Sequence, residues 1–171
     1  NYEKLPRATY WVEGLNGSGG YVTSDQLPGV QSHPLPWFLS GKAAGGSAGA
    51  FGLDRLAQTG GDTFAVDYNL PPAEYFAFWP KPMGEHGLSY ISAPLADPLK
   101  LIGYPVARLT VSSDNPKADV FVYLDQVKPD GKSEVVSFGR LKLSHHKLAL
   151  APYDTPGLPW HSGLVKDVAL P

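Results

Sequence analysis

Alternation between apolar and polar residues is clearest from residue 87 to residue 147. Segments rich in Val, Leu, Ile, Phe and Tyr succeed one another there, and glycine, proline or polar residues separate them at short intervals. This succession predicts a region of β-strands joined by short turns. The expected strands are residues 88–92, 99–103, 105–113, 118–127, 133–138 and 139–144.

The segment 118–127 is apolar on both faces. Val120 and Val122 point one way, and Phe121 and Tyr123 point the other, because successive strand residues face opposite sides. A strand covered on both faces is expected at the centre of a β-sandwich. The following residues, 128–132, place proline and glycine where a tight turn needs them, which predicts a hairpin between 118–127 and 133–138.

The first half of the chain is richer in loops. Strands are expected at 7–14, 21–25, 37–39 and 62–68, whereas the Gly-rich stretch 41–61 and the Pro-punctuated stretch 71–86 are expected to be loops. The sequence thus predicts a single domain over 1–171. Its parts are a loop-rich first half (1–86), a strand-rich core (87–147) and a Pro-rich tail (148–171).

Composition supports an all-β class. The chain has 171 residues, of which 43% are hydrophobic, with 19 glycines and 17 prolines, a content that suits many short strands joined by turns. The net charge of -2, without any basic run, argues against nucleic acid as a partner. No apolar stretch is long enough to cross a membrane. The absence of cysteine excludes disulfides and thiolate chemistry but leaves the compartment open.

Residues 45–49 read Gly-Gly-Ser-Ala-Gly, which matches the G-x-S-x-G pattern of serine hydrolases. That pattern has chemical meaning only where a buried strand precedes the serine and a helix follows it. The preceding residues are small, polar and broken by glycine, so Ser47 is expected to be a loop serine. A free-standing esterase that uses Ser47 is the less favoured alternative.

Other candidate groups favour structural roles. His145 and His146 are adjacent on an expected strand, so they would leave opposite faces and could not readily bind one metal ion. His161, beside Trp160, is expected to make a structural hydrogen bond. Asp62, Asp67 and Asp97 lack the spacing of a calcium loop. No metal, no cofactor and no catalytic residue is therefore expected.

Four aromatic residues are clustered in the loop 71–86. They are Tyr75, Phe76, Phe78 and Trp79. Large apolar side chains on a loop either pack that loop onto the sheet or line an interface or a substrate cleft. Packing onto the sheet is the default expectation, and the lining of a ligand site is the alternative.

An ordered series of motifs over about eighty residues resembles a known family. The series runs through residues 92–95 (Ser-Ala-Pro-Leu), 101–105, 109–113 and 118–124, and it ends in Leu-Pro-Trp-His at 158–161. It is similar to the C-terminal domain of the X-Pro dipeptidyl-peptidase and cocaine esterase (CocE/NonD) hydrolases. The resemblance implies a jelly-roll, galactose-binding-like sandwich attached to an α/β-hydrolase domain that carries the catalytic Ser, Asp and His.

Two departures from the family pattern raise further expectations. Relatives carry a carboxylate pair before the turn and arginines in the next strand, whereas this chain has Asp125-Gln126 and then Lys142 and His146. We therefore expect a weakened or rewired ion pair between these strands. Relatives also continue beyond Pro171, so the sandwich is expected to lack its last strands. Its open sheet edge would be covered by a second chain or by another copy in a homo-oligomer.

The function expected from this resemblance is that of a non-catalytic accessory domain of a serine hydrolase that acts on esters, amides or X-Pro peptides. The domain would brace an α/β-hydrolase catalytic domain, and Phe76, Phe78 and Trp79 would line its substrate cleft. The alternative is a carbohydrate- or ligand-binding β-sandwich module, since the chain has four Trp and nine Tyr.

Overall fold

The computed structural model describes residues 2–14, 17–26, 33–41, 48–55, 60–69, 86–155 and 157–163. Within these residues the regular elements are β-strands and two short 3-10 helices, and no α-helix is present. The predicted all-β class is therefore confirmed. The elements are the 3-10 helix η1 (Tyr2–Lys4), the strands β1 (Ala8–Glu13), β2 (Gly19–Ser24), β3 (Phe38–Ser40), β4 (Gly49–Gly52), β5 (Tyr90–Ile91), β6 (Asp119–Val127) and β7 (Ser133–Lys142), and the 3-10 helix η3 (Leu143–His145).

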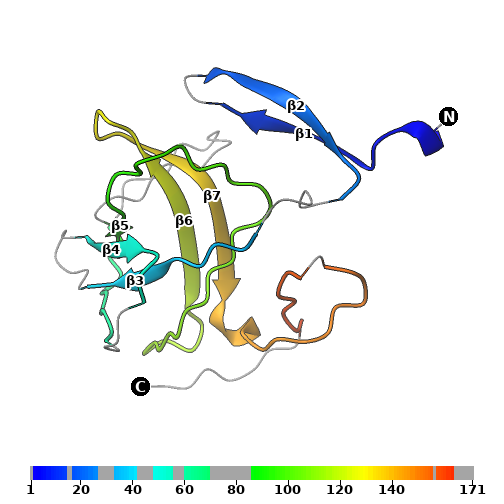
Figure 1. Cartoon of the computed structure of the whole chain (residues 1–171). Coiled ribbons are helices and arrows are strands. Elements are labelled where there is room, and N and C mark those ends of the chain that lie inside the picture. The colour runs from blue at the N-terminus through cyan, green and yellow to red at the C-terminus, as the bar shows by residue number, and fades with distance from the viewer. Residues whose placement is uncertain are drawn as a thin grey trace.

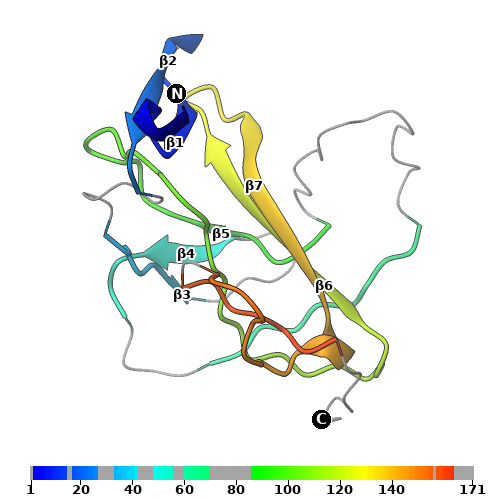
Figure 2. The same ribbon diagram turned by 90° about the vertical axis from the view of Figure 1, so that its right-hand side faces the viewer.

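The described strands pair into small sheets with the orders β1-β2, β3-β4-β5 and β6-β7. Every pairing is antiparallel except that of β4 with β5. The β6–β7 hairpin is the longest element, the β3-β4-β5 sheet lies to one side of it, and the β1–β2 hairpin stands apart near the N-terminus (Figures 1 and 2). The finer jelly-roll topology stays a prediction.

The β1–β2 hairpin is held by a cross-strand aromatic pair. Trp11 lies opposite Tyr21, and their ring centroids are 5.1 Å apart in an edge-to-face arrangement. Gly19 is required beside them, because a Cβ atom there would lie 2.5 Å from the Trp11 ring. Both aromatic residues stay largely exposed, at 52% and 76%.

The predicted hairpin between 118–127 and 133–138 is confirmed, and β7 also takes in most of the segment 139–144. Lys128 N donates to Lys132 O at 2.8 Å, and Gly131 N donates to Lys128 O at 2.9 Å. Gly131 has a φ of 80°. A type I turn followed by a left-handed glycine closes three-residue hairpin loops in this way, so Pro129 and Gly131 serve the roles that the sequence assigns them.

Three predicted strands are absent. Residues 62–68, 99–103 and 105–113 are described and form no strand. A period of two shows only that successive side chains face different surroundings, whereas a strand also needs a neighbour for its backbone groups. Gly103 with a φ of 109°, followed closely by Pro105, interrupts the extended backbone between the last two segments.

Strand β4 lies inside the stretch 41–61 that the sequence predicts to be a loop. It pairs with β3 on one side and with β5 on the other. A Cβ atom on Gly49 would lie 2.6 Å from the Tyr90 ring and 2.9 Å from Ser40 O. Glycine here therefore permits close approach between strands.

The described residues contain little fully buried side-chain surface. Ala8 and Leu143 are the buried apolar residues among them, and Ser144 is the buried polar one. Many large apolar side chains remain exposed, including Trp11, Phe121 and Phe138. No helix in the described part of the chain has the length and apolar character that crossing a membrane would require.

We predict that Gly131→Ala destabilises the hairpin by about 1–2 kcal/mol, because a side chain disfavours positive φ. No atom lies within 4 Å of the added Cβ, so the cost comes from the backbone alone. Gly139→Ala is the matched control, since its Cβ also meets no atom within 4 Å and its φ is not positive. Urea unfolding measures both variants, and equal midpoints would contradict the turn assignment.

Candidate functional site

The β6–β7 hairpin carries an aromatic face that is partly exposed to solvent. Phe121 lies opposite Arg140, and Tyr123 lies opposite Phe138, so Phe121, Tyr123 and Phe138 share one side of the hairpin. The Tyr123 and Phe138 rings are stacked, with centroids 6.1 Å apart and planes at 20°. Phe121 is 54% exposed and Phe138 is 49% exposed. We call these three residues the aromatic face.

The other side of the hairpin is better covered. Val120, Val122 and Leu124 on β6 and Leu141 on β7 all have intermediate burial. The prediction that both faces of 118–127 are covered, as in a central sandwich strand, is therefore wrong for the aromatic face. Apolar residues on both faces of a strand show that both are suited to burial, but they do not show that the same chain supplies both covering layers.

A β-bulge ends the aromatic face. Leu124 pairs with Ser137 while Asp125 pairs with Val135, which leaves Val136 as the extra residue. Asp125 Oδ1 is shielded from solvent and has no hydrogen-bond partner within the described residues. Burial raises the pKa of this carboxyl above its usual value. The Asp125 carboxylate can therefore accept a hydrogen bond at the edge of an apolar surface.

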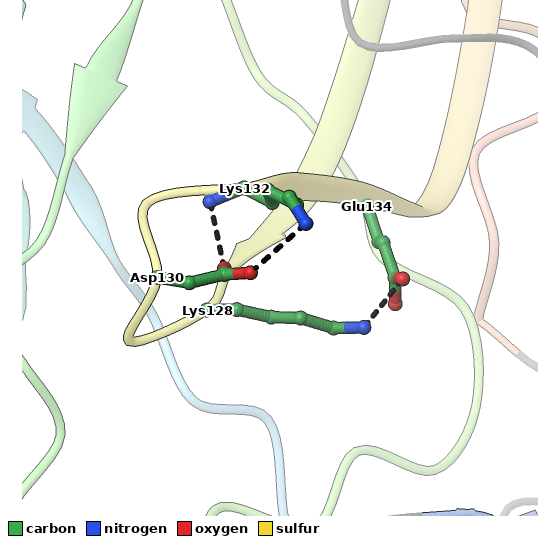
Figure 3. A network of polar contacts seen from close by, with 4 residues as sticks. All are labelled: Lys128, Asp130, Lys132 and Glu134. Atoms are coloured by element: carbon green, nitrogen blue, oxygen red, sulfur yellow. Dashed lines mark hydrogen bonds and ion pairs between the residues drawn. The ribbon is translucent and has the colours of Figure 1, made fainter.

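Ion pairs stabilise the turn beyond the bulge (Figure 3). Lys128 Nζ lies 2.5 Å from Glu134 Oε1, and Lys132 Nζ lies 3.3 Å from Asp130 Oδ2. The Lys132 backbone N–H also donates to Asp130 Oδ1 at 3.1 Å. All four side chains are substantially exposed, so each pair is worth about 1 kcal/mol or less. Their role is to hold the turn.

The expected rewired ion pair is not present. Gln126 lies opposite Glu134 near the turn, whereas Lys142 lies opposite Asp119 at the other end of the hairpin. At about 3.4 Å per residue, the seven-residue separation between these two positions spans roughly 24 Å. His146 lies beyond Lys142, so the four residues of the motif departure cannot share one contact.

Tyr90 and Asp62 form a polar contact between distant segments. The Tyr90 hydroxyl donates to Asp62 Oδ2 at 2.6 Å. Burial raises the pKa of Tyr90 to about 12, and the hydrogen bond to Asp62 and its negative charge add to this effect. The phenol therefore stays protonated, and able to donate, throughout the neutral range. Asp62, which lacks the spacing of a calcium loop, thus contacts a residue 28 positions away in the sequence.

Three of the five histidines, His145, His146 and His161, have structural partners. His145 lies in η3 and not on the expected strand, and its Nδ1 is 3.3 Å from Ser144 Oγ. His146 Nδ1 donates to Leu143 O at 2.8 Å. His161 Nδ1 donates to His146 O at 3.2 Å, which is the structural hydrogen bond expected for it. The described residues bring together no group of three His, Cys, Asp or Glu that could hold a metal ion.

Several predicted positions lie outside the described residues. These are Ser47 and the aromatic residues Tyr75, Phe76, Phe78 and Trp79. The residues after Ser47 are described, and Gly49–Gly52 form strand β4, not the helix that a nucleophile elbow requires. The sequence does not predict the exposure of the aromatic face, because the alternation of residues does not tell which of two apolar faces of a strand stays exposed.

Comparison with known proteins identifies the family. Residues 1–170 match the family described as the X-Pro dipeptidyl-peptidase C-terminal non-catalytic domain. Two curated proteins, from Mycobacterium bovis and Mycobacterium tuberculosis, are each 37% identical to this chain over 65 residues, and both are named "Putative serine esterase". The match spans 38% of this chain and 10% of each relative. No solved structure matches the chain.

The family match covers nearly all of the chain and agrees with the resemblance carried by the motifs between residues 92 and 161. The finer assignment to the CocE/NonD group and to a galactose-binding-like jelly roll stays a prediction. The chain belongs to the family of X-Pro dipeptidyl-peptidase C-terminal non-catalytic domains.

Proposed function

We propose that this domain braces the α/β-hydrolase catalytic domain of a serine hydrolase that acts on esters, amides or X-Pro peptides. The family description as a non-catalytic C-terminal domain supports a catalytic partner domain. The names of the mycobacterial relatives support the serine esterase class. In this proposal the reacting groups belong to the partner domain, and this chain contributes a surface.

The aromatic face is the observation that carries the proposal. Phe121 and Phe138 leave about half of their surface in water, which is unfavourable for large apolar side chains that lie side by side. Covering both would contribute about 2–3 kcal/mol. We assign this face to the contact with the catalytic domain, because β6 and β7 are the longest strands among the described residues and carry the aromatic face.

Asp125 gives the same surface a polar element. Its shielded Oδ1 has no donor within the described residues, and a buried acceptor without a donor is costly. A basic or amide donor from the catalytic domain would remove that cost. Protein interfaces usually combine an apolar centre with hydrogen-bonded polar groups at the rim, and Asp125 would be one of these groups.

We predict that Phe121→Ser combined with Phe138→Ser lowers the melting temperature of the enzyme that contains this domain by roughly 5–10 °C. The reason is that the serines remove apolar contact with the catalytic domain. Leu150→Ser, at a residue 97% exposed, is the control and should leave the melting temperature unchanged. Differential scanning calorimetry checks both.

Two outcomes of this experiment would contradict the bracing role. One is a melting temperature of the double variant equal to that of the Leu150 control. The other is an equal loss of stability when the same variant is made in this domain on its own, because the phenylalanines would then serve only its own folding.

We further propose that Phe76, Phe78 and Trp79 line the substrate cleft. Apolar substrate groups need an apolar lining, and the sequence places these three aromatic residues within four consecutive positions. This role depends on the same catalytic partner as the bracing role.

We predict that Phe78→Ala and Trp79→Ala, made in the enzyme, lower kcat/KM about tenfold for substrates with bulky apolar groups. Substrates with small groups should be affected much less, and the melting temperature should not change. Tyr104→Ala, at an exposed aromatic residue, is the control. An equal loss for every substrate would show that the residues serve packing instead.

A second candidate function is carbohydrate or ligand binding. The observation that favours it is the exposed pair of Trp11 and Tyr21 on the β1–β2 hairpin, because an exposed Trp ring can stack on the apolar face of a sugar. The two rings meet edge to face at 77°, so they do not form one flat platform. A glycan-binding screen separates this function from the bracing role.

A further inference from the structure

We propose that strand β1 is an interface at which two copies of this chain pair, as antiparallel neighbours, into one sheet with the order β2-β1-β1-β2. The partner is therefore a second copy of this chain, which backbone hydrogen bonds and opposite charges recognise. The proposal goes beyond the bracing role and does not depend on it, because it uses the β1–β2 hairpin and not the aromatic face of β6–β7.

Strand β1 has an open edge on the side away from β2. The Gly14 backbone N–H donates to Ser18 O, and these two residues continue the register of the β1–β2 pair. Hydrogen-bonded and non-hydrogen-bonded pairs alternate in an antiparallel ladder, so Thr9, Trp11 and Glu13 belong to the non-hydrogen-bonded pairs. Their backbone N–H and C=O groups point away from β2, and no other described strand pairs with β1.

The hairpin has features that favour a further strand at this edge. It has two strands and stands apart from the other sheets (Figures 1 and 2), and an isolated two-stranded hairpin is marginally stable in water. Edge strands that stay unpaired usually carry a proline, a lysine or a bulge. Strand β1 has none of these between Ala8 and Glu13, so its edge is suited to pairing with another strand.

The sequence around β1 is complementary to itself in the antiparallel direction. Arg7 directly precedes the strand and Glu13 ends it, and both are exposed. Neither side chain has an ion pair among the described residues. The register that places Tyr10 opposite Tyr10 of the second copy also places Arg7 opposite the second copy's Glu13. Symmetry repeats this pair, so opposite charges meet at both ends of the interface, which is stabilising.

The same register uses the outward backbone groups of β1. Thr9 lies opposite the second copy's Trp11, and the two residues exchange backbone hydrogen bonds, again twice by symmetry. The two Tyr10 residues form a non-hydrogen-bonded pair, in which side chains approach most closely and aromatic pairs are favourable. A shift by one residue would place outward groups opposite inward ones, and a shift by two would separate Arg7 from Glu13.

Proline substitution in the enzyme that contains this domain tests the edge. Thr9→Pro removes an N–H that points away from β2, so the ladder of the hairpin stays intact while interface bonds are lost. We expect the dissociation constant of the dimer, measured by sedimentation velocity over a series of concentrations, to rise by about tenfold or more. Thr23→Pro is the matched control, because Thr23 lies opposite Thr9 and its N–H points away from β1. It should leave the dissociation constant unchanged.

Charge reversal tests the register without changing the backbone. Glu13→Arg places two positive charges opposite each other at both ends of the interface, and Arg7→Glu places two negative charges there. Each single variant should therefore raise the dissociation constant about threefold to tenfold. The double variant, Arg7→Glu with Glu13→Arg, restores opposite charges and should return the dissociation constant to within about twofold of its original value.

Several results would overturn the interface. They are an enzyme that stays monomeric at every concentration, a dissociation constant that Thr9→Pro leaves unchanged, and a double charge variant that is as weak as either single variant. A larger effect of Thr23→Pro than of Thr9→Pro would assign the contact to β2 and would also overturn it. Circular dichroism checks that each variant is folded, and if Thr9→Pro is not, the charge variants alone decide.

Discussion

Burial of apolar surface is the main force that stabilises a β-domain, and the strands of this chain present more apolar surface than their own layers cover. Phe121 and Phe138 on β6–β7 and Trp11 on β1–β2 are about half exposed, whereas the buried apolar residues among those described are only Ala8 and Leu143, each still 8% exposed. This imbalance supports the proposed bracing role and the assignment of the aromatic face to the contact with the catalytic domain. The shielded Asp125 Oδ1 at the edge of that face fits the same contact. A catalytic domain packed on β6–β7 would resolve the imbalance, because that hairpin has the longest described strands and carries the aromatic face.

Polar contacts in the described residues mostly act over short distances along the chain. Ser24 with Gln26, Asp67 with Asn69 and Ser113 with Asn115 each join residues two positions apart, and the charged pairs beside Gly131 join residues within one turn. Such bonds define turns but do not hold distant segments together. The contacts Tyr90 with Asp62 and His161 with His146 do join distant segments. The side chains of Tyr90 and Asp62 therefore help to hold together two segments that are far apart in the sequence.

The sequence predicts those features that depend on local chemistry. Pro129 and Gly131 determine the type of turn, so the β6–β7 hairpin is predicted correctly, and the β-branched and aromatic residues of β1 mark that strand. Features that depend on a distant neighbour are not predictable in this way. The segment 105–113 has the right alternation but pairs with no described strand, whereas Gly49 in a glycine-rich stretch does have partners and forms β4. The exposure of Phe121 and the bond from Tyr90 to Asp62 likewise depend on residues far away in the sequence.

Coverage of the aromatic face is measured most directly by hydrogen exchange of the β6 and β7 amides in two states, the domain on its own and the domain within its enzyme. A packed partner raises the free energy of local opening at the strands that it covers. The account predicts that these amides exchange at least tenfold more slowly in the enzyme, which corresponds to about 1.4 kcal/mol of added protection. Equal exchange rates in the two states would show that the catalytic domain does not cover this face, and they would contradict the account.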